Sequence, residues 1–354
     1  MLKRKIRVLI VDDSVLLRSV LGDLLSSDPD IEVVGQVADG KLALPRIREL
    51  KPDVITLDVE MPLMDGVTTL KVIMEEMPTP VVMVSSVTYA GGSKALEALS
   101  AGAFDFVCKP RGQSVSAVRS LKEEIISKVK AAFQAGVRKS PAPLLERSIQ
   151  TPLSIPKREE RWGIVAIGIS TGGPPCVESI LCNAQPGCPP IVVVQHMPKG
   201  YTKAMADRIN NRSKIEVVEA SNGLVLRPGL GVIAPGGSQM EVVGNPGSAV
   251  IRVTNAPPVS GHAPSVDVLF QSLTKTFAKH TMAILMTGMG RDGATGLKLL
   301  KDRGAFTVVQ DEASSTVYGM PKIGFQEGAH VEEWSLNQII TRVGTLISSQ
   351  ARAA

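Results

Sequence analysis

The sequence predicts an α/β protein made of two doubly wound domains joined by a linker. The chain has 354 residues, more than one hydrophobic core usually organises. Short apolar runs alternate with helical patterns on both sides of a stretch that lacks periodic apolar positions. This alternation is typical of parallel sheets covered by helices. We therefore expect domains at residues 1–134 and 161–354, with an extended linker rich in Pro, Ser and basic residues at 135–160.

Five strand-like runs define the first domain. They occupy residues 6–11, 31–37, 54–57, 81–84 and 104–107. Amphipathic segments separate them, and a helical pattern at 114–135 leads into the linker. Five strands each followed by a helix predict a doubly wound five-stranded parallel sheet.

The second domain resumes this alternation and adds one irregular stretch. Strand-like runs lie at residues 164–169, 191–195, 215–219, 231–234, 282–286 and 306–310, with helical patterns at 266–277 and 297–303. Residues 222–258 are rich in Gly and Pro and contain short alternating runs at 240–243 and 249–253. We interpret this stretch as a β-hairpin excursion from a doubly wound α/β domain.

Composition argues against several classes of protein. Aromatic residues make up 3% of the chain, which argues against a base-stacking surface for single-stranded nucleic acid. The net charge is +5, and much of the excess of basic residues lies in the linker, so no nucleic-acid partner is expected. No apolar run reaches the roughly 18 residues that a membrane span requires, which predicts no direct membrane insertion. The four cysteines form no CxxC pair, which disfavours a zinc site. With no signal-peptide core after the basic start, we expect a cytoplasmic protein.

Acidic and basic residues gather at the strand ends of the first domain. Asp12 and Asp13 follow the first strand, Asp58 follows the third, Ser85 the fourth and Lys109 the fifth. Because the carboxyl ends of parallel strands meet at one edge, these groups should form one site. Three carboxylates there require a cation, and oxygen ligands suit Mg²⁺. Asp58 could then attack a phosphoryl group while Lys109 neutralises the phosphoryl oxygens. The alternative is that these Asp residues only cap the helices that follow the strands.

A serine ends the first strand of the second domain. Ser170 follows residues 164–169 and precedes Thr171, Gly172 and Gly173. A serine on a strand-to-helix turn exposes its hydroxyl, and nearby backbone N–H groups can stabilise an oxyanion, which makes Thr171 and Gly172 candidates for that role. A phosphate-binding turn is the competing interpretation, although neither GxGxxG nor a P-loop lysine is present.

Partners for this serine occur at two further strand ends. His196 follows residues 191–195, and Asp292 follows residues 282–286. A lone histidine is usually structural, and Asp292 alone could simply favour a helix N-terminus. Their joint position favours a nucleophile, base and orienting acid. The chain order Ser, His, Asp differs from that of the α/β-hydrolases.

Other reactive side chains are weaker candidates. His262, Ser265 and Asp267 form a possible second constellation, but Ser265 precedes an apolar helix and is expected to be its N-cap. Cys176 is a possible thiol nucleophile, yet its place within a helical pattern favours packing.

Residues 6 to about 125 resemble a response-regulator receiver domain. The resemblance rests on residues 11–14 (VDDS), 57–66 (LDVEMPLMDG), 84–86 (VSS) and 107–110 (VCKP). It implies Asp58 as phosphoacceptor for a chemotaxis histidine kinase, Asp13 and Asp58 as direct metal ligands and Asp12 as an outer one. It also implies Phe106 as an aromatic switch that moves with Ser85, and a cis peptide before Pro110.

Residues 162 to about 350 resemble the catalytic domain of the bacterial chemotaxis receptor methylesterase, or protein-glutamate methylesterase. The resemblance rests on residues 167–174 (IGISTGGP), 195–197 (QHM), 264–270 (PSVDVLF) and 287–293 (TGMGRDG). It implies Ser170 as nucleophile, His196 as general base, Asp292 as orienting acid and the Met289 backbone as an oxyanion donor. The implied substrates are methylated chemoreceptors, with deamidation of receptor glutamines as a second activity and no cofactor for the hydrolase.

The pairing of the two domains suggests a regulated enzyme of chemotactic adaptation. Our hypothesis is that the receiver covers the active-site mouth until phosphorylation of Asp58 loosens the interface. A non-enzymatic response regulator that acts by docking remains an alternative. A DNA-binding regulator is disfavoured because the second half shows no helix-turn-helix pattern.

Overall fold

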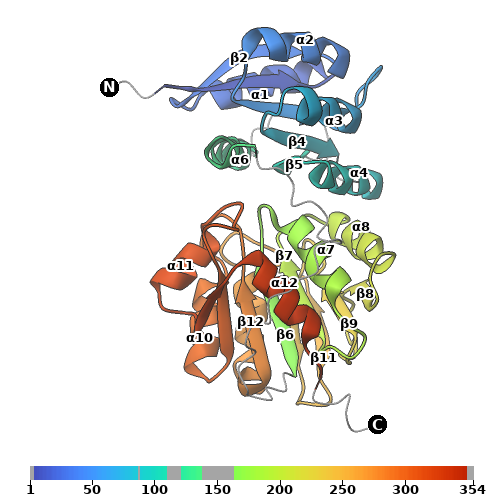
Figure 1. The fold of residues 1–354 in the computed structure, drawn as a ribbon, viewed down its shortest axis with the longest axis vertical. Coiled ribbons are helices and arrows are strands. Elements are labelled where there is room, and N and C mark those ends of the chain that lie inside the picture. Colours follow the sequence, from blue (N-terminus) through green and yellow to red (C-terminus); the bar gives the residue numbers. More distant parts are fainter. Residues whose placement is uncertain (1–3, 87, 110–120, 138–162, 349–354) are drawn as a thin grey trace, which may run out of the picture. The chain divides into compact units, whose positions relative to one another are not determined.

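The computed structural model describes residues 4–86, 88–109, 121–137 and 163–348. The chain divides into two compact units, Met1–Ser140 and Pro141–Ala354 (Figure 1). Most of the expected linker, the peptide before Pro110 and the start of the helical pattern at 114–135 lie outside the described residues.

The first unit is a five-stranded parallel sheet in the order β2-β1-β3-β4-β5, as predicted. Its strands are β1 (Ile6–Val11), β2 (Ile31–Val37), β3 (Val54–Asp58), β4 (Val81–Ser86) and β5 (Asp105–Lys109). Its helices are α1 (Val15–Ser26), α2 (Gly40–Leu50), α3 (Gly66–Glu76), α4 (Tyr89–Ser100) and α6 (Lys122–Ala135). Three strands run slightly further than expected, so Asp58, Ser85 and Lys109 lie within strand ends.

Helices cover both faces of this sheet. Alternate strand residues such as Val8, Val54 and Val82 are buried under α1 and α6, which also contact each other. Helices α2, α3 and α4 pack in sequence as a separate group. This arrangement gives the doubly wound architecture that the strand and helix alternation predicts.

The second unit contains a seven-stranded sheet in the order β14-β13-β12-β6-β7-β9-β8, in which all neighbours are parallel. The strands are β6 (Ile164–Ile169), β7 (Ile191–Gln195), β8 (Glu216–Glu219), β9 (Leu230–Ile233), β12 (Thr281–Leu285), β13 (Phe306–Gln310) and β14 (Glu332–Trp334). The helices are α7 (Gly173–Asn183), α8 (Tyr201–Asn210), α9 (Val266–Leu273), α10 (Ala294–Asp302), α11 (Met320–Gln326) and α12 (Leu336–Thr345), with a short 3₁₀ helix, η1 (Ala278–His280). Strand β14, an edge strand of three residues, was not predicted from the sequence.

The predicted hairpin excursion is confirmed. Strands β10 (Gln239–Val243) and β11 (Val250–Thr254) pair antiparallel in a sheet of their own. Met240 and Val242 of this hairpin share a core with Phe270 of α9, against which β10 packs. The excursion thus covers the helix that begins beside the strand ends of the main sheet.

The carboxyl end of β6 is the topological switch point of this sheet. The chain leaves β6 for β7 on one side, and β12 later pairs with its other side. Neighbouring helices diverge at such a switch point, where open α/β sheets bind ligands. Ser170 occupies this position because it directly follows β6.

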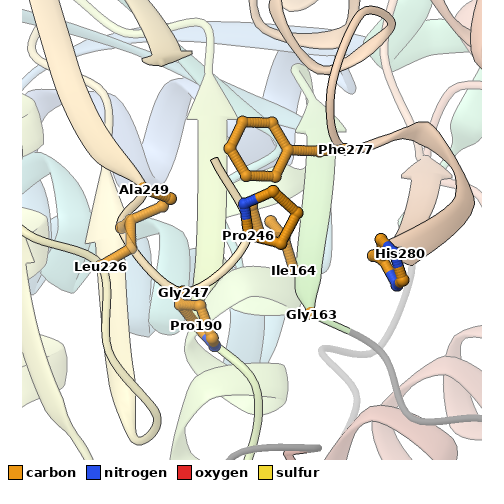
Figure 2. A pocket seen from close by; sticks show the side chains of 9 residues that line it. All are labelled: Gly163, Ile164, Pro190, Leu226, Pro246, Gly247, Ala249, Phe277 and His280. Carbon is orange, nitrogen blue, oxygen red and sulfur yellow. The ribbon is translucent and has the colours of Figure 1, made fainter. Parts of the chain in front are cut away.

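A cavity of about 240 Å³ lies at the opposite, amino end of β6 (Figure 2). Gly163, Ile164 and Pro190 line it, together with Leu226, Pro246, Gly247, Ala249, Phe277 and His280. Its lining is almost entirely apolar side chain or glycine, so it offers little for the chemistry expected at Ser170. Within the described ranges, no helix is long and apolar enough to cross a bilayer.

Candidate functional sites

The first unit brings its predicted acids and lysine together. One carboxylate oxygen from each of Asp12, Asp13 and Asp58 lies within 4.8 Å of the others. Lys109 Nζ lies 2.6 Å from Asp58 Oδ2 and 3.1 Å from Asp12 Oδ2. Asp12 and Asp58 are buried, whereas Asp13 is exposed at the rim. The parallel sheet therefore produces the cluster because β1, β3 and β5 end at one edge.

Burial dominates the electrostatics of this cluster. It raises the pKa of Asp58 to about 6; the Lys109 charge opposes that shift and the Asp12 charge adds to it. Burial also raises the pKa of Asp12, again opposed by Lys109. Burial acts to lower the pKa of Lys109, but the two carboxylates outweigh it and the pKa is raised. One ammonium thus faces more negative charge than it neutralises, which favours a further cation.

The donor set fits a hard divalent cation. Asp12 Oδ2 is buried, and although Lys109 Nζ lies nearby, no described group donates a well-formed hydrogen bond to this oxygen. Buried carboxylate oxygens rarely remain without a donor, so this atom is suited to face a cation. Three converging carboxylates are the ligands that Mg²⁺ prefers. The residues present are therefore consistent with the expected metal site.

The proposed switch residues have contacts of their own within the first unit. Ser85 Oγ donates a hydrogen bond of 3.2 Å to Gly91 O in α4. Phe106 is 5% exposed, and Lys128 Nζ lies 5.3 Å from the centre of its ring. Ser85 would therefore have to leave Gly91 before it could bind a phosphoryl group on Asp58.

In the second unit, Ser170, His196 and Asp292 form a continuous hydrogen-bond chain. Ser170 follows β6, His196 follows β7, and Asp292 lies between β12 and α10. Ser170 Oγ lies 3.1 Å from His196 Nδ1, and His196 Nε2 lies 2.8 Å from Asp292 Oδ2. The three side chains that sequence analysis selected on strand ends thus meet at the switch point of the sheet.

The orientation of the imidazole determines its tautomer. An ionised Asp292 only accepts hydrogen bonds, so His196 Nε2 must carry the proton that it donates. Nδ1 of a neutral ring is then a bare lone pair facing Ser170 Oγ. His196 is consequently prepared to accept the serine proton.

Asp292 is held by the amino end of α9. Its Oδ1 accepts hydrogen bonds from Ser265 Oγ at 2.8 Å and Asp267 N at 3.2 Å, and its Oδ2 accepts one from Val266 N at 2.7 Å. Burial acts to raise the pKa of Asp292, but the bonds from His196, Ser265 and Val266 outweigh burial and hold the pKa below its ordinary value. Asp292 is therefore a firmly ionised, fixed acceptor.

The expected second constellation is part of this same site. Ser265 occupies the N-cap position of α9, but its side chain makes no capping hydrogen bond and binds Asp292 instead. Asp267 Oδ1 accepts a hydrogen bond of 2.6 Å from Gly296 N. Burial raises the pKa of Asp267; Gly296 opposes this shift and the Asp292 charge adds to it. The ring of His262 stacks on that of His196.

Cys176 packs in the core, as expected. Its side chain is buried, and its thiol donates to Gly172 O at 3.3 Å. Burial raises the pKa of this thiol to about 12, which keeps it protonated at neutral pH. A thiol nucleophile at Cys176 is therefore disfavoured.

The turn after Ser170 presents free backbone donors. In the described part of the chain, the N–H groups of Thr171 and Gly172 donate to no protein acceptor. Gly172 adopts φ +76°, a conformation that favours glycine. Met289 follows Gly288, where an added Cβ would lie 2.6 Å from Ser170 Cβ. The turn at Thr171 and Gly172 and the segment that leads into Met289 thus both lie next to Ser170.

Two supporting residues were missed by sequence analysis. Gln195 Nε2 donates to Ser170 O at 2.9 Å and to His196 O at 3.3 Å, so it ties together the two catalytic candidates. Thr287 Oγ1 donates to Thr171 O at 2.9 Å, and Thr287 O accepts from Ser170 N at 2.9 Å. A polar residue at the end of an otherwise apolar run was the available signal for both.

Gly288→Ala is expected to lower kcat about 10²-fold. The new Cβ would displace Ser170, and a shift of a reacting group by about 1 Å has an effect of this size. Gly328→Ala is the control: its φ is +62°, yet an added Cβ meets nothing within 4 Å. It should lower the melting temperature without lowering kcat. Normal kcat in Gly288→Ala would show that the close approach to Ser170 does not matter.

The fold and the two sites define a class of protein: a response regulator whose output domain is a hydrolase. The CheB methylesterase model matches residues 165–343, and the response regulator receiver domain model matches residues 8–119. The chain belongs to the CheB methylesterase family.

Relatives align over nearly the whole chain. A protein-glutamate methylesterase/protein-glutamine glutaminase of Methanococcus maripaludis is 44% identical, over 91% of this chain and 92% of the relative. A similarly named protein of Anaeromyxobacter dehalogenans is 46% identical, over 96% of this chain and 94% of the relative. The solved catalytic domain of Thermotoga maritima CheB methylesterase is 33% identical, with a TM-score of 0.50, and covers 52% of this chain and 97% of that domain.

Proposed function

We propose that this chain hydrolyses γ-methyl esters of glutamate on chemoreceptors and releases methanol, and that phosphorylation of Asp58 raises this activity. The observation that carries the proposal is the unbroken chain of hydrogen bonds from Ser170 through His196 to Asp292. The names of the relatives support the ester and amide substrates. The receiver domain supports control by a histidine kinase, which implies a cytoplasmic reaction.

The first half-reaction forms an acyl-enzyme. His196 Nδ1 accepts the Ser170 proton as Oγ bonds to the ester carbonyl carbon. Negative charge moves to the carbonyl oxygen, where the N–H groups of Thr171, Gly172 and Met289 are the candidate donors. When the tetrahedral intermediate collapses, the bond to the methoxy oxygen breaks and His196 delivers its proton to that oxygen. Methanol leaves, and the glutamyl group remains on Ser170.

The second half-reaction restores the enzyme. His196 takes a proton from water, whose oxygen attacks the acyl carbon, and then returns the proton to Ser170 Oγ as that bond breaks. Glutamate is the product. A glutamine substrate would follow the same steps with ammonia as the leaving group, which accounts for the proposed deamidation.

Asp292→Asn is expected to lower kcat by about 10⁴-fold. The amide can donate its N–H to His196 Nε2 and so stabilise the tautomer that carries the proton on Nδ1, which cannot accept the serine proton. The equivalent substitution in serine proteases has an effect of about this size. Asp302→Asn is a suitable control, since this exposed residue pairs only with Lys298 in α10 among the described contacts. Measuring kcat for all three proteins at saturating receptor checks the prediction. A decrease of less than tenfold would contradict the orienting role.

The receiver site would accept phosphate on Asp58. We propose that Asp13 and Asp58 bind Mg²⁺ directly and that Asp12 binds it as an outer ligand; the bound ion would neutralise charge on the phosphoryl oxygens. Asp58 attacks phosphorus as the bond between phosphorus and the donor breaks, so that the kinase histidine or the remainder of a small phosphodonor departs as the leaving group. Lys109 stabilises the charge on the product. Ser85 then exchanges Gly91 O for a phosphoryl oxygen, and Phe106 moves with it.

Product analysis tests the proposed substrates. Purified protein is incubated with methylated receptor and, separately, with receptor carrying glutamine at the same positions. Methanol is expected from the first and ammonia from the second, each with glutamate in the receptor by mass spectrometry. Signalling without either product would favour the docking alternative, and a promoter-DNA shift at physiological salt would favour the DNA-binding one.

A further inference from the structure

A second histidine lies flat against the candidate base. The ring centroids of His196 and His262 are 3.8 Å apart, and their planes differ by 8°. Ser170 and Asp292 contact the two ring nitrogens of His196 at the edge of the ring, so neither of them covers a ring face. His262 covers one of the two faces, and the His196 side chain is 7% exposed.

The loop that carries His262 is fixed by its own backbone. Val259 and His262 exchange two backbone hydrogen bonds of 3.0 and 2.9 Å across a two-residue turn. Ser260 and Gly261 in that turn have φ values of +53° and +82°. Two positive φ values are typical of the tightest hairpin turns, which leave little freedom.

The β10–β11 hairpin anchors the same loop from outside. Gln239, the first residue of β10, is buried; its Nε2 donates to His262 O at 3.0 Å, and its Oε1 accepts from Ser265 N at 2.8 Å. Ser265 in turn binds Asp292. Residues 262–265 thus contain both the ring that covers one face of His196 and the serine that binds the Asp292 carboxylate.

We propose that His262 is a positioning residue that confines the His196 ring to the plane in which Nδ1 reaches Ser170 and Nε2 reaches Asp292. The inference rests on the proposed function of the triad. Tilting the ring out of that plane would weaken both hydrogen bonds at once, and contact across a whole ring face opposes the tilt. Proton transfer depends steeply on such geometry. The role requires a flat ring rather than a titrating nitrogen.

Two substitutions of His262 separate a flat ring from other roles. His262→Ala is expected to lower kcat roughly 10- to 100-fold, because catalysis is sensitive to misplacement by about 1 Å, while KM changes little. His262→Phe keeps a flat ring and should recover most of kcat. The control is His330→Ala, which removes a histidine stacked on Phe325 of α11 at 4.7 Å and should leave kcat unchanged.

Labelling by a fluorophosphonate separates this inference from the proposed function. The reagent reports the nucleophilicity of Ser170 and needs no receptor. Its second-order rate constant should fall in His262→Ala in parallel with kcat and recover in His262→Phe. Normal labelling by folded His262→Ala would overturn the proposal. So would labelling of folded His262→Phe that is as slow as labelling of His262→Ala. Rapid labelling of the wild type without methanol release would instead refute the esterase substrate.

Discussion

Ser170→Ala is expected to reduce methanol release by at least about 10⁴-fold, because loss of the nucleophile removes the whole covalent pathway. The substitution deletes only Oγ, whose described partner is His196 Nδ1. The backbone bond from Ser170 N to Thr287 O remains, so the turn and the melting temperature should be preserved. The measurement is kcat/KM on methylated receptor, with thermal unfolding recorded alongside.

Ser179→Ala is a matched control for this prediction. Ser179 lies in α7, the helix that follows Ser170, and its hydroxyl donates to Pro175 O at 2.9 Å. The same atom is deleted, yet no triad bond is lost, and activity should match the wild type. Equal methanol release by Ser170→Ala and wild type would place the nucleophile elsewhere or show that another protein causes the release.

Asp58→Asn is expected to abolish the response of methanol release to a small phosphodonor while preserving the unstimulated rate. The amide matches the carboxylate in size but lacks the nucleophilic oxygen that bonds to phosphorus. It also removes the ion pair of 2.6 Å to Lys109. The ratio of rates with and without phosphodonor checks the effect, and phosphate-affinity electrophoresis checks the modification.

Asp53→Asn controls for loss of an acid elsewhere in the same unit. Asp53 precedes β3, and its Oδ2 accepts a hydrogen bond of 2.9 Å from Arg7 N. This variant should still be phosphorylated and stimulated. A normal response by Asp58→Asn would mean that another residue carries the phosphate, and the predicted receiver site would be wrong.

The sequence predicted the two sheets well because their central strands are buried on both faces. Fully apolar runs such as Ile164–Ile169 are bounded sharply by polar or glycine residues, so a strand end can be located to within about two residues. Side chains at those ends converge by topology alone. For this reason Asp58 and Ser170 could be paired with partners far away in the sequence.

The supporting parts of the sites were harder to predict because they depend on tertiary contacts. Ser265 has the sequence signature of an N-cap, yet the nearby Asp292 carboxylate competes successfully for its hydroxyl. The stacking of His262 depends on a turn and on Gln239 from a separate hairpin. Strand β14 has only three residues, two of them acidic, and forms because β13 offers an open edge. No local periodicity encodes these arrangements.

We propose that this chain joins a phosphoacceptor to a serine esterase. The most direct measurement is the rate of methanol release from methylated receptor by the purified wild-type protein, with and without phosphodonor in the presence of Mg²⁺. We expect release in both conditions and a higher rate with phosphodonor, an increase that disappears when Mg²⁺ is chelated. Absence of methanol, or the same rate with and without phosphodonor, would contradict the proposal.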